Sequence, residues 1–192
     1  METTCGACGK PLESFEMIHV AGEGPRCYPC FNRETADRLG IDFDEPQFRP
    51  IVLEDADGTP HTFTIRSMLV PTGLEMEAIE RVDDGRGGYR YAVLAEFEAD
   101  PWEVFQRLYA NMRRELALRH VQRTEFGWQL TSDQRLVGRI EWDPDSEVRL
   151  PLIVIDGRAF TWREVGHMLM TFEGFTLEAR IKDTIEVVGD SE

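Results

Sequence analysis

The chain has 192 residues, a formal net charge of −15 and a hydrophobic fraction of 42%, with eleven Phe, four Trp and four Tyr. This length is enough for one hydrophobic core with a small appended module, and the apolar content is too high for a disordered chain. The acidic charge disfavours a nucleic-acid partner, because affinity for a polyanion comes mainly from basic residues. The sequence contains neither an apolar run long enough for a membrane span nor a secretory signal, so we expect a cytoplasmic protein without membrane contact.

All four cysteines lie in the first thirty residues, where Cys5 and Cys8 form one Cys-x-x-Cys pair and Cys27 and Cys30 form the other. In a reducing compartment, this spacing is more typical of metal binding than of disulfides. Each pair can direct two sulfurs at one ion, and two pairs complete a tetrahedral shell. The sequence therefore predicts a structural Zn²⁺ bound by the four cysteines. His19 could compete as a ligand, but its position favours an ordinary strand residue.

The predicted elements of this module alternate turns with short regular structure. A hairpin is expected with arms at 17–20 and 25–28 that turn at 22–24. The second cysteine pair then opens a helix over 31–39, and Gly40 occupies the position of a C-cap.

With this order of elements, residues 5 to 39 resemble a treble-clef zinc finger, and the cysteine spacing is similar to that of GATA-type and LIM-type fingers. The resemblance implies that the four cysteines are the zinc ligands. GATA-type fingers read DNA with a basic helix and tail. The helix expected here has Arg33 and Arg38 against Glu34 and Asp37 and leads into an acidic linker, which argues against DNA binding.

Residues 41–50 contain two prolines and three acidic residues without periodicity, and we interpret them as a linker. The linker separates a zinc-binding module at 1–40 from an α+β domain at 51–192. The first half of this domain predicts an antiparallel meander, since alternating polarity and turn residues favour strands at 51–53, 61–70, 74–81 and 89–97.

The longest predicted helix begins at Pro101 and continues to Val121. Asp100 is expected as its N-cap, and Glu103 stands where a capping box places its acidic residue. One stripe of this helix should pack on the sheet, and it consists of Phe105, Leu108, Tyr109, Met112 and Leu116, with His120 at its end.

The remaining residues predict strands followed by one short helix. Strands are expected at 127–130 and 134–142, and a hairpin is expected with arms at 150–155 and 159–160. Thr161 and Glu164 form a capping box that opens a helix to about Met170, with Trp162 anchored in the core. The most regular strand pattern of the chain covers 175–181. The predicted fold class is therefore α+β, with the zinc module followed by a mainly antiparallel sheet packed by one long and one short helix.

Beyond the cysteines, no residues form a recognisable catalytic set. His61, His120 and His167 are isolated in the sequence and are interpreted as structural residues. Acidic pairs at i and i+2 could act as acid and base or bind a divalent cation, although coincidence explains them in so acidic a chain; they are Glu75 with Glu77, Glu96 with Glu98, and Asp143 with Asp145. We predict no catalytic residue and no cofactor other than Zn²⁺.

These observations favour a non-enzymatic interaction or adaptor protein whose partner is another protein. A first alternative is a nucleic-acid-binding regulator that uses the zinc module or the basic stretch at 102–123, whose arginines are Arg107, Arg113, Arg114, Arg119 and Arg123. A second alternative is an enzyme of an unfamiliar class with convergent acids or histidines, such as His61 or His167, in a pocket of the sheet domain.

Overall fold

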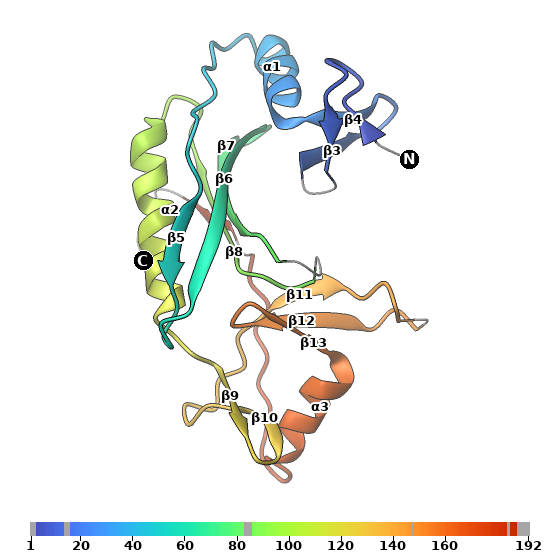
Figure 1. Ribbon diagram of the computed structural model, residues 1–192, viewed down its shortest axis with the longest axis vertical. Helices are drawn as coiled ribbons and strands as arrows, with labels where there is room; N and C mark the ends of the chain where they lie inside the picture. The colour runs from blue at the N-terminus through green and yellow to red at the C-terminus, as the bar shows by residue number, and fades with distance from the viewer. Residues whose placement is uncertain (1–2, 14–15, 83–85, 147, 184, 188–192) are drawn as a thin grey trace.

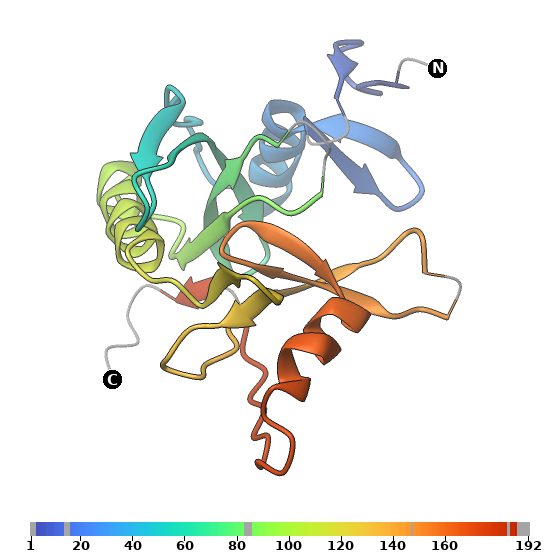
Figure 2. The ribbon, with the colours of Figure 1, turned by 60° about the horizontal axis from the view of Figure 1, so that its bottom comes forward.

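The computed structural model describes residues 3–13, 16–82, 86–146, 148–183 and 185–187. Over these residues the fold is α+β, with three helices and strand pairs that are antiparallel except for one (Figures 1 and 2). The predicted fold class is confirmed at this level. In the described part of the chain, no helix is long and apolar enough to cross a membrane.

The N-terminal module contains two small hairpins and one helix. Strand β1 (Thr3–Thr4) pairs with β2 (Pro11–Leu12), and β3 (Met17–Val20) pairs with β4 (Gly24–Cys27). Helix α1 (Tyr28–Leu39) follows directly and ends at Gly40, which is left-handed with a φ of 69°. The predicted hairpin and the predicted helix end are thus confirmed. The helix begins earlier than predicted because Pro29 stands in the first turn, where its missing N–H costs no helical hydrogen bond.

A five-stranded sheet forms the centre of the molecule, in the order β14-β8-β7-β6-β5. The strands β5 (Ile51–Glu54), β6 (Pro60–Val70), β7 (Gly73–Glu80) and β8 (Arg90–Ala95) form the predicted antiparallel meander. Strand β14 (Ile185–Val187) returns from the end of the chain and pairs with β8 in parallel. The expected strand at 89–97 is shorter because the chain turns after Ala95.

Helix α2 (Pro101–Leu116) covers one face of this sheet (Figure 1). The predicted N-cap is confirmed, because the Asp100 side chain accepts a hydrogen bond from the backbone N–H of Trp102. The buried core between helix and sheet consists of Phe63, Ile65, Met76, Ala78, Tyr91, Val93, Ala95, Val104, Leu108, Met112 and Leu116. Three predicted stripe residues of the helix are therefore buried, whereas Phe105 and Tyr109 are half-buried.

The predicted end of this helix at Val121 is wrong. The helix stops at Leu116, and Val121 begins the strand β9 (Val121–Thr124), which pairs with β10 (Gly127–Leu130). His120 is buried, but it lies in the turn before β9 and not on the helical stripe. The backbone N–H groups of His120 and Val121 both donate to the Asp156 carboxylate, and this distant partner ends the helical course of the chain.

The C-terminal lobe consists of this pair of strands, a three-stranded sheet and helix α3. The sheet contains β11 (Arg139–Trp142), β12 (Pro151–Ile155) and β13 (Arg158–Thr161) in sequence order, and α3 (Trp162–Met170) packs against it. The predicted capping box of Thr161 and Glu164 is confirmed. A second core lies here and consists of Val121, Leu130, Ile153, Ile155, Phe160, Val165 and Met168.

Three further expectations for this lobe are wrong. The strand expected at 134–142 forms only from Arg139, and Trp162 is 46% exposed because it stands at the first position of α3, facing away from the core. The strand expected at 175–181 does not form, although its alternation is the most regular in the chain. Alternating polarity favours an extended backbone, but a strand also needs a neighbour, and no described residue pairs with this segment.

Candidate metal centre

The fold brings the four cysteines together at one point. The Sγ atoms of Cys5, Cys8, Cys27 and Cys30 all lie within 4.8 Å of one another, and those of Cys8 and Cys27 are 3.8 Å apart. All four are free thiols. A tetrahedral ion with metal–sulfur bonds of about 2.3 Å separates its sulfurs by about 3.8 Å. The cluster therefore has the dimensions of a metal site.

Local backbone structure places each cysteine pair. Cys5 and Cys8 lie in a tight turn, in which the N–H of Cys5 donates to the carbonyl of Lys10 and the N–H of Gly9 donates to that of Cys5. Gly9 has a φ of 74°, a conformation that favours glycine. At Gly6, a Cβ would lie 2.7 Å from the Arg26 guanidinium, so the end of the Arg26 side chain would have to shift.

The second pair joins a strand to a helix. Cys27 ends β4 and is the N-cap residue of α1, and Cys30 lies in the first turn of that helix. Cys5, Cys27 and Cys30 are buried, whereas Cys8 is exposed. The two turns therefore hold the sulfurs at the edge of the module, with one thiol facing solvent.

Polar groups around the sulfurs differ from one cysteine to the next. The backbone N–H of Cys27 lies 3.4 Å from the Sγ of Cys5, and the Arg33 guanidinium lies 3.6 Å from the Sγ of Cys30. Burial opposes ionisation of Cys5, but hydrogen bonds from backbone N–H groups outweigh it and lower its pKa to about 6. Burial raises the pKa of Cys30 to about 12 and also raises that of Cys27.

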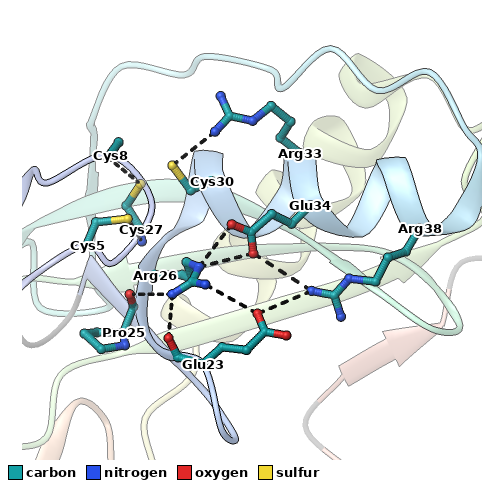
Figure 3. A network of polar contacts seen from close by, with 10 residues as sticks. All are labelled: Cys5, Cys8, Glu23, Pro25, Arg26, Cys27, Cys30, Arg33, Glu34 and Arg38. Atoms are coloured by element: carbon teal, nitrogen blue, oxygen red, sulfur yellow. Dashed lines mark hydrogen bonds and ion pairs between the residues drawn. The ribbon is translucent and has the colours of Figure 1, made fainter.

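A network of charged residues braces the hairpin β3–β4 against α1 (Figure 3). The Nε of Arg26 donates to both carboxylate oxygens of Glu34, at 3.1 and 3.2 Å, and its Nη1 donates to the carbonyl of Glu23. Arg38 approaches Glu34 and Glu23 at 3.9 Å. Of the four charged residues named for this helix, Glu34 and Arg38 therefore belong to the network, and Arg33 faces the Sγ of Cys30.

A buried polar side chain connects the module to the central sheet, beside an apolar cluster in which Ala36 of α1 packs with Leu69 and Leu74. The Asn32 amide nitrogen donates to the carbonyl of Ser67, and its oxygen accepts from the backbone N–H of Leu69, both at 2.9 Å. Asn32 is 1% exposed. The Arg66 guanidinium also lies 4.5 Å from the centre of the Tyr28 ring. The module is thus docked on β6 through its helix, which the sequence analysis did not anticipate.

The histidines do not join the cysteine cluster. His19 is exposed on β3, and in the described residues the cysteines are the only grouping of possible metal ligands. His167 is exposed on α3. The ring of His120 lies 3.0 Å from Asp156, a carboxylate that also binds two backbone N–H groups. These contacts favour the structural role that the sequence suggests for His120.

His61 lies at a cavity of about 550 Å³ between the central sheet and the C-terminal lobe. Its Nδ1 is 2.6 Å from Glu80, and its Nε2 is 3.3 Å from Asp55. Arg119 pairs with Asp55 and Asp57 at the same cavity. Both ring nitrogens therefore face carboxylates, which leaves neither available as a general base in this arrangement.

The acidic pair Glu75 and Glu77 lies on the sheet face opposite α2, beside a second cavity of about 510 Å³. Glu77 is 1% exposed and is bound by Arg66 and Arg90. Burial raises the pKa of Glu75, and the charge of Glu77 adds to this effect. The other predicted pairs lie in turns: Glu96 and Glu98 are exposed, and Asp143 accepts a hydrogen bond from the N–H of Asp145.

Three family models match the chain in succession, and each is described as a domain of unknown function. They are DUF7685 over residues 4–42, DUF7686 over 44–117 and DUF7713 over 120–186. These segments correspond to the cysteine module, to the linker with the meander and α2, and to the C-terminal lobe with β14. No curated protein and no solved structure matches the chain.

Proposed function

We propose that the protein is a cytoplasmic, non-enzymatic protein-interaction module stabilised by one structural Zn²⁺ on Cys5, Cys8, Cys27 and Cys30. The observation that carries the proposal is the closed set of four thiols. Zinc sites that catalyse reactions usually retain an open coordination position, whereas four cysteine ligands fill a tetrahedral shell.

The order of elements supports a treble-clef arrangement for the module. A turn with the first cysteine pair is followed by the hairpin β3–β4, and the second pair lies at the start of α1. Four thiolates around Zn²⁺ carry an excess negative charge, which Arg33 and the backbone N–H of Cys27 are placed to offset. Because Asn32 lies on the same helix as Cys30, the ion would also hold the side of the module that contacts β6.

A protein partner is supported by apolar side chains exposed beside one hairpin. Ile140 and Trp142 on β11 are 56% and 62% exposed, and Val148 and Leu150, which precede β12, are 74% and 41% exposed. A group of exposed aliphatic residues with a tryptophan is typical of protein contact surfaces. We define these four residues as the β11 patch.

Photo-crosslinking in cells tests the proposed partner surface. A photoreactive amino acid at position 142 should form a discrete adduct with another protein, and the same amino acid at Asp37, exposed on α1, should not. An Ile140→Ser change should remove the adduct. Equal adducts at both positions, or turnover of a substrate by the purified protein, would contradict the proposal.

The cavity beside His61 supports the enzyme alternative, because charged side chains converge there on a space large enough for a small molecule. This alternative requires the His61 ring to lose its contact with Glu80 or Asp55 when a ligand binds. A screen of metabolites by thermal shift, with His61→Gln as the comparison, tests it. A ligand that stabilises the native protein and not the variant would favour a site here over a purely structural cluster.

The nucleic-acid alternative rests on the basic stretch at 102–123. Two of its arginines are engaged within the protein, since Arg114 pairs with Glu115 and Arg119 with Asp55. The alternative predicts binding whose affinity falls steeply as salt rises, and the absence of binding at low salt would remove it.

A further inference from the structure

The segment between α3 and β14 combines an unpaired backbone with a strongly patterned sequence. Over residues 176–183, within the part of the chain that the structure describes, no backbone N–H donates a hydrogen bond to another residue. Every residue from 175 to 183 is exposed. Phe175, Leu177 and Ile181 are 70%, 66% and 83% exposed. Exposed backbone groups without such partners resemble those at the edge of a sheet.

The side chains of this segment would separate onto two faces if it formed a strand. Alternate residues of a strand point to opposite sides, so Phe175, Leu177, Ala179 and Ile181 would share one face, with Asp183 at its end. Thr176, Glu178, Arg180 and Lys182 would share the other. The missing element is a neighbouring strand, and it must accept an apolar face on one side and charges of both signs on the other.

A second copy of the same segment meets both requirements in one register. In an antiparallel pair, residues directly opposite each other lie on the same face. If the two-fold axis passes through Ala179, Glu178 of each copy stands opposite Arg180 of the other. On the other face, Leu177 then stands opposite Ile181, and Phe175 stands opposite Asp183 at each end of the pair.

The neighbouring registers are less favourable. An axis through Glu178 places the two Glu178 carboxylates opposite each other, and an axis through Arg180 does the same with two guanidinium groups. Like charges directly opposite each other destabilise a strand pair, whereas opposite charges stabilise it. Charge complementarity therefore favours a second copy as the partner and selects this register.

We propose that residues 175–183 form a self-association strand, which pairs antiparallel with the same residues of a second copy around a two-fold axis at Ala179. Such an interface is closed, because each copy presents the same segment to the other around the two-fold axis. Its nine residues per copy are fewer than the 20–30 or so of a standard interface, so the dimer should dissociate on dilution. This surface differs from the metal centre, and the proposal stands independently of it; Arg180, Ile181 and Lys182 line the same cavity as Ile140 of the β11 patch.

Charge exchange across the axis tests the proposal. Analytical ultracentrifugation should show a monomer–dimer equilibrium for the native chain. Glu178→Arg should weaken the dimer about ten-fold, because it creates two Arg–Arg contacts. Arg180→Glu should weaken it similarly by creating two Glu–Glu contacts. The double variant E178R/R180E restores opposite charges at both positions and should recover most of the native affinity.

A matched control separates this effect from a general change in charge. Glu173→Arg alters the net charge as Glu178→Arg does, but residue 173 lies outside the segment and should leave dimerisation unchanged. A native protein that remains monomeric up to about 1 mM would overturn the proposal. A dimer that the single variants do not weaken, or that the double variant does not restore, would also overturn it, because another surface would then hold the copies together.

Discussion

The cysteine module and the central sheet contain very different buried cores. The core of the module consists of Cys5, Cys27 and Cys30, with Leu12 packed against them. The sheet and α2 bury eleven residues in one continuous cluster. Burial of apolar side chains is the main stabilising contribution in a domain, and a module of about forty residues cannot bury enough of them to fold alone. The two regions should therefore respond to different perturbations.

The largest effect should follow removal of the metal, and it should be confined to one region. Binding of structural zinc by small modules contributes about 10 kcal/mol or more to folding. After treatment with a strong chelator, hydrogen exchange should show loss of protection in β3, β4 and α1, whereas β6, β7 and β8 should keep theirs. Equal loss of protection in both regions, or no loss in the module, would contradict this difference between the two regions.

The reverse experiment removes a side chain from the core of the sheet. Leu108 is fully buried beneath α2, so Leu108→Ala should lower the free energy of unfolding by about 2–5 kcal/mol in urea titrations. The zinc content should not change. Arg107→Ala, at the neighbouring exposed position, is the control and should alter stability by about 0.5 kcal/mol or less. A similar loss in both variants would argue against this packing of α2.

Much of this architecture could be predicted from local sequence signals. The Cys-x-x-Cys spacing predicts a cluster because each pair needs only one turn to align its sulfurs, and the meander follows from alternation between turn residues. The docking of the module could not be predicted, because it depends on distant strands: Asn32 binds backbone groups of β6, and Ala36 packs with Leu69 and Leu74. The end of α2 was mispredicted for the same reason, since Asp156 lies 36 residues from His120.

At residues 175–183, in contrast, a strong local pattern predicts a strand that does not form. Its alternating polarity favours an extended chain with two distinct faces. The pattern does not show whether another strand lies beside the segment, and a strand needs such a neighbour. The surroundings of the buried Glu77 could not be predicted either. Alternation on β7 indicates which residues share a face, but it does not indicate that Arg66 and Arg90 both bind the Glu77 carboxylate.

An intermediate effect is expected at the contact between the two regions. Asn32→Ala removes two hydrogen bonds and leaves the buried N–H of Leu69 without its acceptor, which should cost about 1–3 kcal/mol. The zinc should remain bound, while hydrogen exchange at Leu69 and in the adjacent part of β6 should accelerate. Asp37→Ala, exposed on the same helix, is the matched control and should not accelerate exchange at Leu69. Unchanged exchange in Asn32→Ala would show that other contacts hold the module.

The smallest effect concerns pH and the pairing of His120 with Asp156 in the C-terminal lobe. The hydrogen bond to Asp156 raises the pKa of His120 above 6.5, so its stabilisation is complete at lower pH and is lost as pH rises through the folded value. Burial opposes ionisation of Asp156, but hydrogen bonds from His120 and Val121 outweigh this effect and lower the pKa of Asp156 below 3.8. The contribution of Asp156 is therefore lost as pH falls through that lowered value.

Both groups contribute fully between about pH 4 and 6.5. In thermal melts, the free energy of unfolding should fall by about 1 kcal/mol or less above this pH window. The His120→Gln change should remove that dependence on pH. The cysteine module provides the internal comparison, because its protection against hydrogen exchange should not change with the charge of His120. A native lobe whose stability rises between pH 6.5 and 8 would contradict the assignment of this pair.

X-ray absorption at the zinc edge tests the central claim most directly. The account predicts one zinc per chain, with four sulfur neighbours at about 2.3 Å, and loss of bound zinc in a Cys5→Ser/Cys30→Ser variant. Iron in place of zinc, nitrogen or oxygen in the first coordination shell, or a native protein without metal would contradict a structural zinc site formed by these four cysteines.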